Sequence, residues 1–204
     1  TTFQWSPDGS RLAYARPDSI GLVDTKNGDQ TTLVEFAPYQ PKTDWAWVPW
    51  ISWSDDNHVI YTVINTTDES GDSYNLSAVL LNEKRVVPLV AKSGLFSYPV
   101  PSPTNEDGMY SIGFLSTIIP EQSETSRYNL NIMDRDGSNR KKLYPGEGQQ
   151  GLDPQTICWS PEPDENGDNW IAFITQGNLM LVNIQRGTIK QVTGDGSITR
   201  LTWR

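Results

Sequence analysis

The chain has 204 residues, 36% of them hydrophobic and 10% aromatic, which is enough to build a buried core. Its 16 Lys and Arg residues against 25 Asp and Glu residues give a net charge of −9, which repels nucleic-acid phosphates and anionic lipid headgroups. The single cysteine, Cys158, rules out a disulfide within the chain, and one Cys with one His, His58, rules out a zinc site of Cys and His ligands. No apolar run reaches the length of a membrane span. We therefore expect no nucleic-acid partner and no membrane insertion.

A Trp-Ser-Pro-Asp motif recurs along the chain. It stands as Trp5-Ser6-Pro7-Asp8-Gly9, then as Trp53-Ser54-Asp55-Asp56, in reduced form as Pro101-Ser102-Pro103, and again as Trp159-Ser160-Pro161; Trp203 marks a fifth copy. The steps between successive anchor serines are 48, 48 and 58 residues, and Trp159 and Trp203 are 44 residues apart. This period is typical of a propeller blade.

The segments between the anchors predict β-strands. Short alternating apolar runs are separated by Gly, Asn, Asp and Pro, with no sustained helical period. In the first repeat we predict strands at 3–6, 12–15, 20–24 and 31–36, with an Asn27-Gly28 turn before the last. The later repeats follow the same pattern, with strands predicted at 59–64, 76–81, 86–90, 109–115, 130–133, 141–144, 170–174, 179–184 and 189–192.

These repeats predict an all-β chain, a β-propeller of four-stranded antiparallel blades. A single meander cannot bury both of its faces, so neighbouring meanders must stack. The predicted blades are 1–49, 50–96, 97–154 and 155–197, and 198–204 would be one extra innermost strand. Because a duplicated innermost strand does not complete a ring, we expect part of a six- to eight-bladed ring, which needs about 290 residues or more. A closed four-bladed ring is the alternative.

Two stretches resemble a known repeat family. Residues 5–14, from Trp5-Ser6-Pro7-Asp8-Gly9 onward, and residues 131–143, which include Asp134-Arg135-Asp136-Gly137, are similar to the two halves of the WD-like repeat of TolB-like propellers. TolB is the periplasmic component of the Tol-Pal system, and the same repeat occurs in propellers of prolyl-oligopeptidase-type serine peptidases. The resemblance implies a propeller fold and a periplasmic or extracellular, cell-surface location.

The candidate binding residues lie on long connections. The anchor Trp, Ser and Asp-Gly residues are explained by blade packing and turn chemistry. Connections at 37–49, 66–73, 118–127 and 144–155 share one face of a propeller, where function usually lies. The candidates on this face are Tyr39, Asp44, Trp45, Trp47, Trp50, Tyr98, Glu147 and Asp153.

Trp45, Trp47 and Trp50 lie within six residues of one another and outside the repeat. Their aromatic faces beside Asp44 would suit an apolar peptide side chain or a sugar ring. The alternative is that they only cap the hydrophobic gap between blades.

The sequence nominates no catalytic set. His58 is expected in a turn on the face opposite the long connections, no Gly-x-Ser-x-Gly is present, and no phosphate or dinucleotide loop is found, so we expect no cofactor and no metal. Asp134 and Asp136 begin like a calcium loop, but Pro145 stands where the distal Glu would be, which favours a hairpin turn over a weak cation site. Cys158 is expected to be a small strand hydrophobe.

We therefore predict a non-catalytic scaffold propeller of the bacterial envelope that binds a protein or peptide, with a glycan as the other ligand class. The alternative is a propeller that gates substrate for a catalytic domain outside these residues. An α/β-hydrolase sequence next to this one in the gene would favour the alternative.

Overall fold

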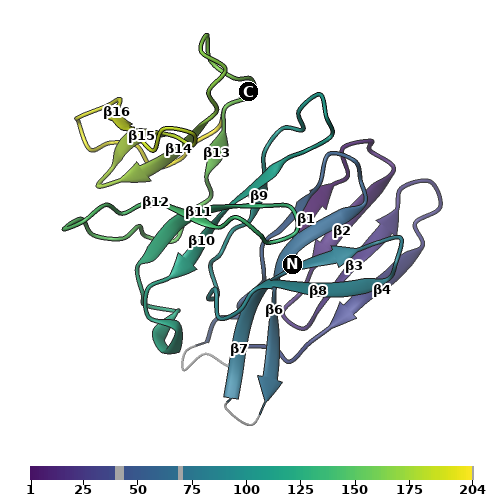
Figure 1. The fold of residues 1–204 in the computed structure, drawn as a ribbon. Coiled ribbons are helices and arrows are strands. Elements are labelled where there is room, and N and C mark those ends of the chain that lie inside the picture. The colour runs from purple at the N-terminus through teal and green to yellow at the C-terminus, as the bar shows by residue number, and fades with distance from the viewer. Residues whose placement is uncertain (40–43, 69–70, 204) are drawn as a thin grey trace. The chain divides into compact units, whose positions relative to one another are not determined.

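The computed structural model describes residues 1–39, 44–68 and 71–203, and these form two compact units, Thr1–Pro99 and Val100–Arg204. Each unit holds two four-stranded sheets in which sequential strands pair antiparallel, so each sheet is a meander (Figure 1). The only helical element in the described ranges is a short 3-10 turn, η1 (Pro120–Gln122), and no described helix could cross a membrane. The predicted all-β blades are confirmed.

The first unit contains the first two blades. Their strands are β1 (Thr2–Trp5), β2 (Arg11–Ala15), β3 (Ser19–Asp24) and β4 (Gln30–Glu35), followed by β5 (Ile51–Trp53), β6 (Val59–Asp68), β7 (Gly71–Leu80) and β8 (Arg85–Val90). A shared core joins the two sheets, because Ala13, Ala15 and Ile20 of the first pack with Ile51 and Ile60 of the second, all at 0% exposure. Stacking of neighbouring sheets thus buries the faces that a single meander leaves open.

The second unit repeats this arrangement. Its strands are β9 (Val100–Pro101), β10 (Ser111–Thr117), β11 (Tyr128–Asp134) and β12 (Lys141–Tyr144), followed by β13 (Cys158–Trp159), β14 (Trp170–Thr175), β15 (Asn178–Asn183) and β16 (Ile189–Gln191). The Tyr144 and Phe173 rings pack across the two sheets with centroids 5.0 Å apart. Gly113 of β10 lies directly against Ile157 and Trp159, where a Cβ atom would overlap the Ile157 side chain.

The anchor serine closes the first hairpin of every blade. In the second blade, the Ser54 amide donates to the Val59 carbonyl (2.9 Å), and the Val59 amide donates to Ser54 Oγ (3.0 Å). The Ser54 hydroxyl also donates to Asp56 Oδ1 (2.5 Å). The same two-way pairing joins Ser6 to Arg11, Ser102 to Ser111 and Ser160 to Trp170. The structural explanation of the recurring serine is therefore correct.

The anchor tryptophan joins neighbouring innermost strands within a unit. Trp53 Nε1 donates to the carbonyl of Gln4 on β1 (3.1 Å), and Trp159 Nε1 donates to the carbonyl of Val100 on β9 (2.8 Å). The third anchor has Pro101 in place of Trp, and the chain divides into its two units just before it, after Pro99. Trp5 of the first blade is 63% exposed.

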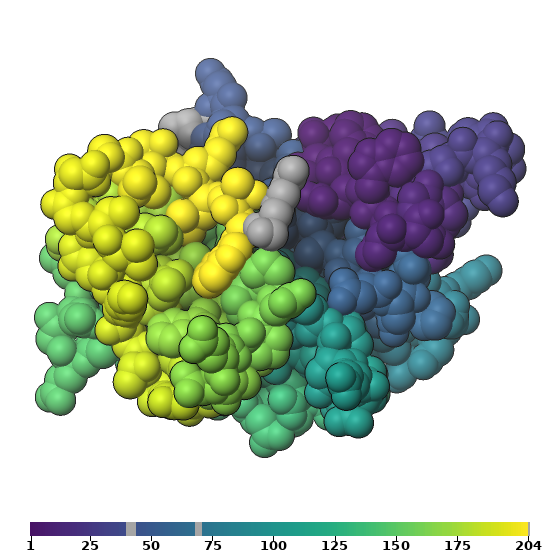
Figure 2. All heavy atoms as spheres, turned by 90° about the horizontal axis from the view of Figure 1, so that it is seen from above, coloured from purple at the N-terminus to yellow at the C-terminus, as the bar shows by residue number. Residues whose placement is uncertain are grey.

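Two predictions about elements were wrong. Residues 66–68 and 71–73 belong to β6 and β7 and are not a long connection, since backbone pairing continues to Asp68 and Gly71. Residues 198–203 form no strand in the described part of the chain. Leu201 and Trp203 instead line a small cavity together with Leu179 and Leu181 of β15. Figure 2 shows the yellow C-terminal residues beside the rest of the fourth blade. Arg204 lies outside the described residues.

Candidate binding sites

Seven aromatic side chains of the first unit form a continuous series, here called the aromatic array. It comes from the connection before β5, from β7 and from the segment after β8, and every ring contacts the next with centroids 5.6 to 6.5 Å apart. In order of contact the members are Trp47, Tyr74, Tyr39, Trp45, Phe96, Tyr98 and Trp50. Five of them were predicted as site residues, and the structure brings these five together.

One end of the array is built into the core. Trp47 is 2% exposed, and its indole N–H donates to the Leu95 carbonyl (3.1 Å). Tyr74 is also buried, and its hydroxyl donates to Asp72 Oδ2 (3.4 Å). Burial, with the charge of Asp72, raises the pKa of Tyr74 well above its usual value, so the phenol stays protonated. Trp47 thus packs in a core cluster with Val63, Tyr74 and Leu95, which is a packing role and not that of an open binding face.

The other five rings are half-buried and have different surroundings. The Phe96 ring is nearly parallel to the Trp45 and Tyr98 rings, with interplanar angles of 22° and 19° and centroids 6.5 and 6.1 Å apart. Tyr98 has φ 41, a left-handed conformation that is strained for a bulky residue, and burial raises its pKa. The Trp50 Nε1 donor is shielded from water and has no hydrogen-bond partner among the described residues. An unpaired buried donor costs about 1 to 3 kcal/mol of folding free energy.

The acidic candidates do not join the array. Asp44 is exposed, and Glu147 and Asp153 belong to the second unit. Asp153 forms an ion pair with Arg127 and lines a polar cavity of about 650 Å³ together with Gln150 and Asn178; Glu147 is exposed and is not among the lining residues. Tyr74 and Phe96 were missed as members. Phe96 lies two residues before the predicted Tyr98, whereas Tyr74 lies on β7 opposite Asn65, with no predicted candidate near it in sequence or register.

A second cavity, about 590 Å³ in volume, lies between the first hairpins of the third and fourth blades and was not predicted. We call it the anchor-turn pocket. These hairpins are longer than those of the first two blades: the anchor serine pairs with a residue 9 or 10 positions on, against 5 in the earlier blades. The anchor prolines Pro103 and Pro161, together with Pro163, line the pocket with Trp159 and Ile184. Three acidic side chains, Glu106, Asp134 and Glu162, also line it.

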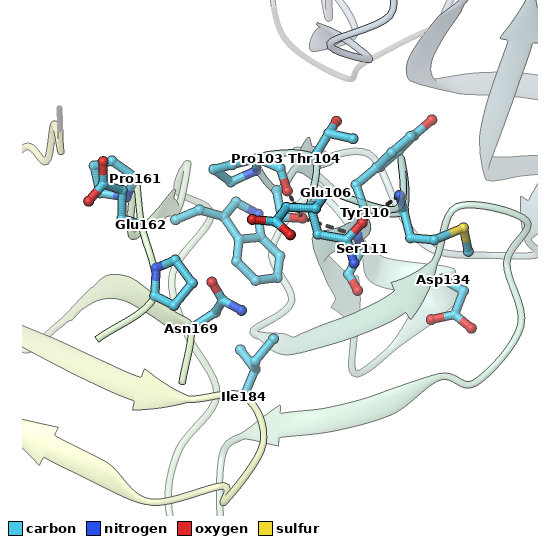
Figure 3. Close-up of a pocket in the computed structure, with 15 residues that line it drawn as sticks. Pro103, Thr104, Glu106, Tyr110, Ser111, Asp134, Pro161, Glu162, Asn169 and Ile184 are labelled. Carbon is cyan, nitrogen blue, oxygen red and sulfur yellow. Dashed lines mark hydrogen bonds between the residues drawn. The ribbon is translucent and has the colours of Figure 1, made fainter. Parts of the chain in front are cut away.

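Figure 3 shows how the polar groups of this pocket lie. The Glu106 side chain is directed into the space between its own hairpin and Pro161 and Glu162 of the neighbouring hairpin, with Asn169 and Ile184 below it in this view. The Asp134 carboxylate accepts a hydrogen bond from Asn139 Nδ2 (2.7 Å). Only the lengthening of the hairpins and their prolines signal this pocket in the sequence.

The remaining candidate groups lie apart from both sites. His58 is an exposed turn residue, as predicted, with Nδ1 3.6 Å from Asp56 Oδ2. Cys158 lies half-buried on β13, as expected of a strand residue, and burial raises the pKa of its thiol, which makes it less nucleophilic. Among the described residues, no group of three or more acidic, His or Cys side chains could hold a metal ion.

Comparison with known proteins supports the fold. No protein-family model and no curated protein sequence matches the chain. An oligogalacturonate lyase in complex with manganese superposes with a TM-score of 0.57 at 12% identity, over 94% of this chain and 52% of the lyase. A putative TolB from Agrobacterium tumefaciens superposes with a TM-score of 0.57 at 17% identity, over 92% of this chain and 62% of the TolB chain. An auxiliary nutrient binding protein from Bacteroides thetaiotaomicron superposes with a TM-score of 0.54 at 11% identity, over 97% of this chain and 42% of the binding protein.

These solved structures are propellers, so the chain has a propeller-type fold. At these identities the likeness shows the fold alone. The chain spans between 42% and 62% of the length of the three structures.

Proposed function

We propose that this chain is a portion of a non-catalytic β-propeller that binds a protein or peptide partner through the aromatic array, in the periplasm or at the cell surface. The array carries the proposal, because six of its seven rings lie in connections outside the blade repeat and only two of the seven are buried as core residues. The likeness to a TolB and to a nutrient binding protein supports the location.

The geometry of the array favours a peptide over a glycan. Sugar rings bind to an open aromatic face, but no ring of the array is fully exposed, and each has another ring of the array within 6.5 Å of its centroid. A peptide needs instead half-buried apolar surface for a side chain and a donor for a backbone carbonyl. Trp50 Nε1 is shielded from water in the free chain, so it becomes such a donor only if the bound peptide displaces the atoms that cover it.

Selection of peptides tests the proposal. We would pan a random dodecapeptide phage library against the intact chain and measure the binding of selected synthetic peptides by fluorescence polarisation. Trp45→Ala should weaken binding by about 2 kcal/mol, roughly thirtyfold, as expected for an interface tryptophan. Trp5→Ala, which removes an exposed tryptophan outside the array, is the matched control.

The control should bind as the unsubstituted chain does. Equal binding by Trp45→Ala, accompanied by a lower melting temperature, would mean that the array serves packing alone. Binding of oligosaccharides from a glycan array, lost in Trp45→Ala, with no peptide selected, would reject the peptide assignment.

A further inference from the structure

The anchor-turn pocket offers a second recognition site on the second unit, independent of the aromatic array. Its volume of about 590 Å³ falls within the range of about 300 to 1,000 Å³ found for ligand pockets. Its walls combine flat apolar groups, the Trp159 ring and the prolines, with the three carboxylates Glu106, Asp134 and Glu162. None of its 15 lining residues is basic.

Two basic side chains of these blades have partners elsewhere. Lys141 Nζ donates to the Ile184 carbonyl (2.9 Å), and Arg186 pairs with Asp168 through Nε (2.6 Å). Among the described residues, no ion pair joins Glu106 or Glu162 to a basic side chain. The pocket therefore presents negative charge beside apolar walls, in a chain whose net charge of −9 already attracts cations.

We infer that the anchor-turn pocket receives an arginine side chain of an extended segment from a partner protein. A guanidinium is flat, so it stacks on aromatic and proline surfaces, and its five N–H donors match several carboxylate oxygens at once. Glu106 and Glu162 approach from two different hairpins, which suits a group that donates in two directions (Figure 3). A lysine ammonium shares the charge but not the planar stacking, so it fits less well.

Short peptides test this inference on the intact chain. Isothermal titration calorimetry would compare Ac-Gly-Arg-Gly-NH2 with the same peptide carrying citrulline, which keeps the shape and loses the charge, or lysine. We expect the arginine peptide to bind with a dissociation constant on the order of 1 mM and the citrulline peptide about tenfold more weakly. Amide NMR shifts should fall in 102–111 and 159–163.

Charge-neutral variants locate the site. Glu106→Gln with Glu162→Gln should weaken arginine-peptide binding about tenfold, whereas Glu165→Gln, an exposed change in the fourth-blade hairpin outside the pocket lining, should change it less than about twofold. Because all three side chains are exposed, the fold should be retained.

Four results would each overturn the inference: equal binding of the citrulline peptide, unchanged binding by the double variant, shifts that lie outside the two hairpins, or no shift up to about 10 mM peptide. Spermidine, a free polyamine, is added to the chain in the same NMR experiment. If spermidine shifts these resonances and the arginine peptide does not, the pocket takes a free polyamine and the partner-segment assignment is wrong.

Discussion

At the residue scale, the anchor tryptophan has a different environment in different blades, because the segment that it contacts differs. Trp53 is 8% exposed, bonds to the Gln4 carbonyl (3.1 Å), and has the Arg11 guanidinium 5.2 Å from its ring centroid. Trp5 occupies the same place in the first blade and is 63% exposed. The sequence shows two equivalent residues, whereas burial of the ring depends on the blade beside it.

Trp53→Phe tests this difference. The substitution keeps an aromatic ring but removes the N–H donor and leaves the Gln4 carbonyl unpaired, so the free energy of unfolding should fall by about 1 to 2 kcal/mol. Trp5→Phe is the matched control and should change it by less than about 0.5 kcal/mol. Urea unfolding followed by circular dichroism measures both. Equal losses in the two variants would contradict the inter-strand role of Trp53.

The anchor aspartate gives a pH dependence. Hydrogen bonds from the Ser6 hydroxyl and from the Ser10 amide and hydroxyl lower the pKa of Asp8 from 3.8 to about 2. A pKa lowered by folding stabilises the folded state above the unfolded value of 3.8, and this contribution disappears as the pH falls from about 4 to about 2.

Asp8→Asn should therefore lower the melting temperature at pH 6 and flatten its fall between pH 4 and pH 2. Scanning calorimetry at closely spaced pH values measures the difference. Glu147→Gln removes the same charge from an exposed connection and should leave the slope unchanged. An Asp8→Asn profile parallel to that of the unsubstituted chain would show that these hydrogen bonds add no pH-dependent stability.

At the element scale, strand pairing and blade stacking are set by different parts of the sequence. Apolar alternation and turn residues located the four meanders, but 66–73 was interpreted as a loop because its polar residues lack that alternation. Thr66, Thr67 and Asp72 are exposed at the end of the β6–β7 hairpin, where backbone hydrogen bonds hold the pair without a buried face. The alternation of apolar and polar residues therefore predicts which strand residues are buried better than it predicts how far a strand extends.

Gly113→Ala tests the stacking of the third and fourth blades. A Cβ atom on β10 would overlap the Ile157 side chain and lie 3.3 Å from the Trp159 ring, so unfolding free energy should fall by about 1 to 3 kcal/mol. Gly194→Ala is the control, since its nearest neighbour, Gln191 Nε2, is 3.9 Å away. Chemical denaturation of both variants gives the comparison. A Gly113→Ala chain as stable as the control would show that these strands are not closely packed.

At the scale of the whole molecule, the fold was predictable and the sites only partly so. The 48-residue spacing of the anchors is enough to predict a propeller, because each repeat contributes the same four strands. The aromatic candidates could be found because Trp45, Trp47 and Trp50 fall outside that repeat. Their division into a buried Trp47 and half-buried Trp45 and Trp50 depends on contacts with the segment after β8, which no local pattern encodes.

The anchor-turn pocket could likewise be predicted from the sequence only in part. The longer hairpin of the fourth blade is visible in the sequence as the turn residues between Ser160 and the strand predicted from Trp170, but a cavity forms only where two such hairpins stand side by side. Neighbouring blades had to be assembled before Glu106 and Glu162 could be placed on one pocket.

The proposed partner binding at the aromatic array is tested most directly by hydrogen–deuterium exchange of the intact chain with and without a selected peptide. Bound peptide should slow exchange in the described residues of 36–50 and in 91–99, the segments that carry six of the seven rings, and leave the hairpins at 54–59 and 160–170 unchanged. Protection confined to those hairpins, with none in the array segments, would contradict the account.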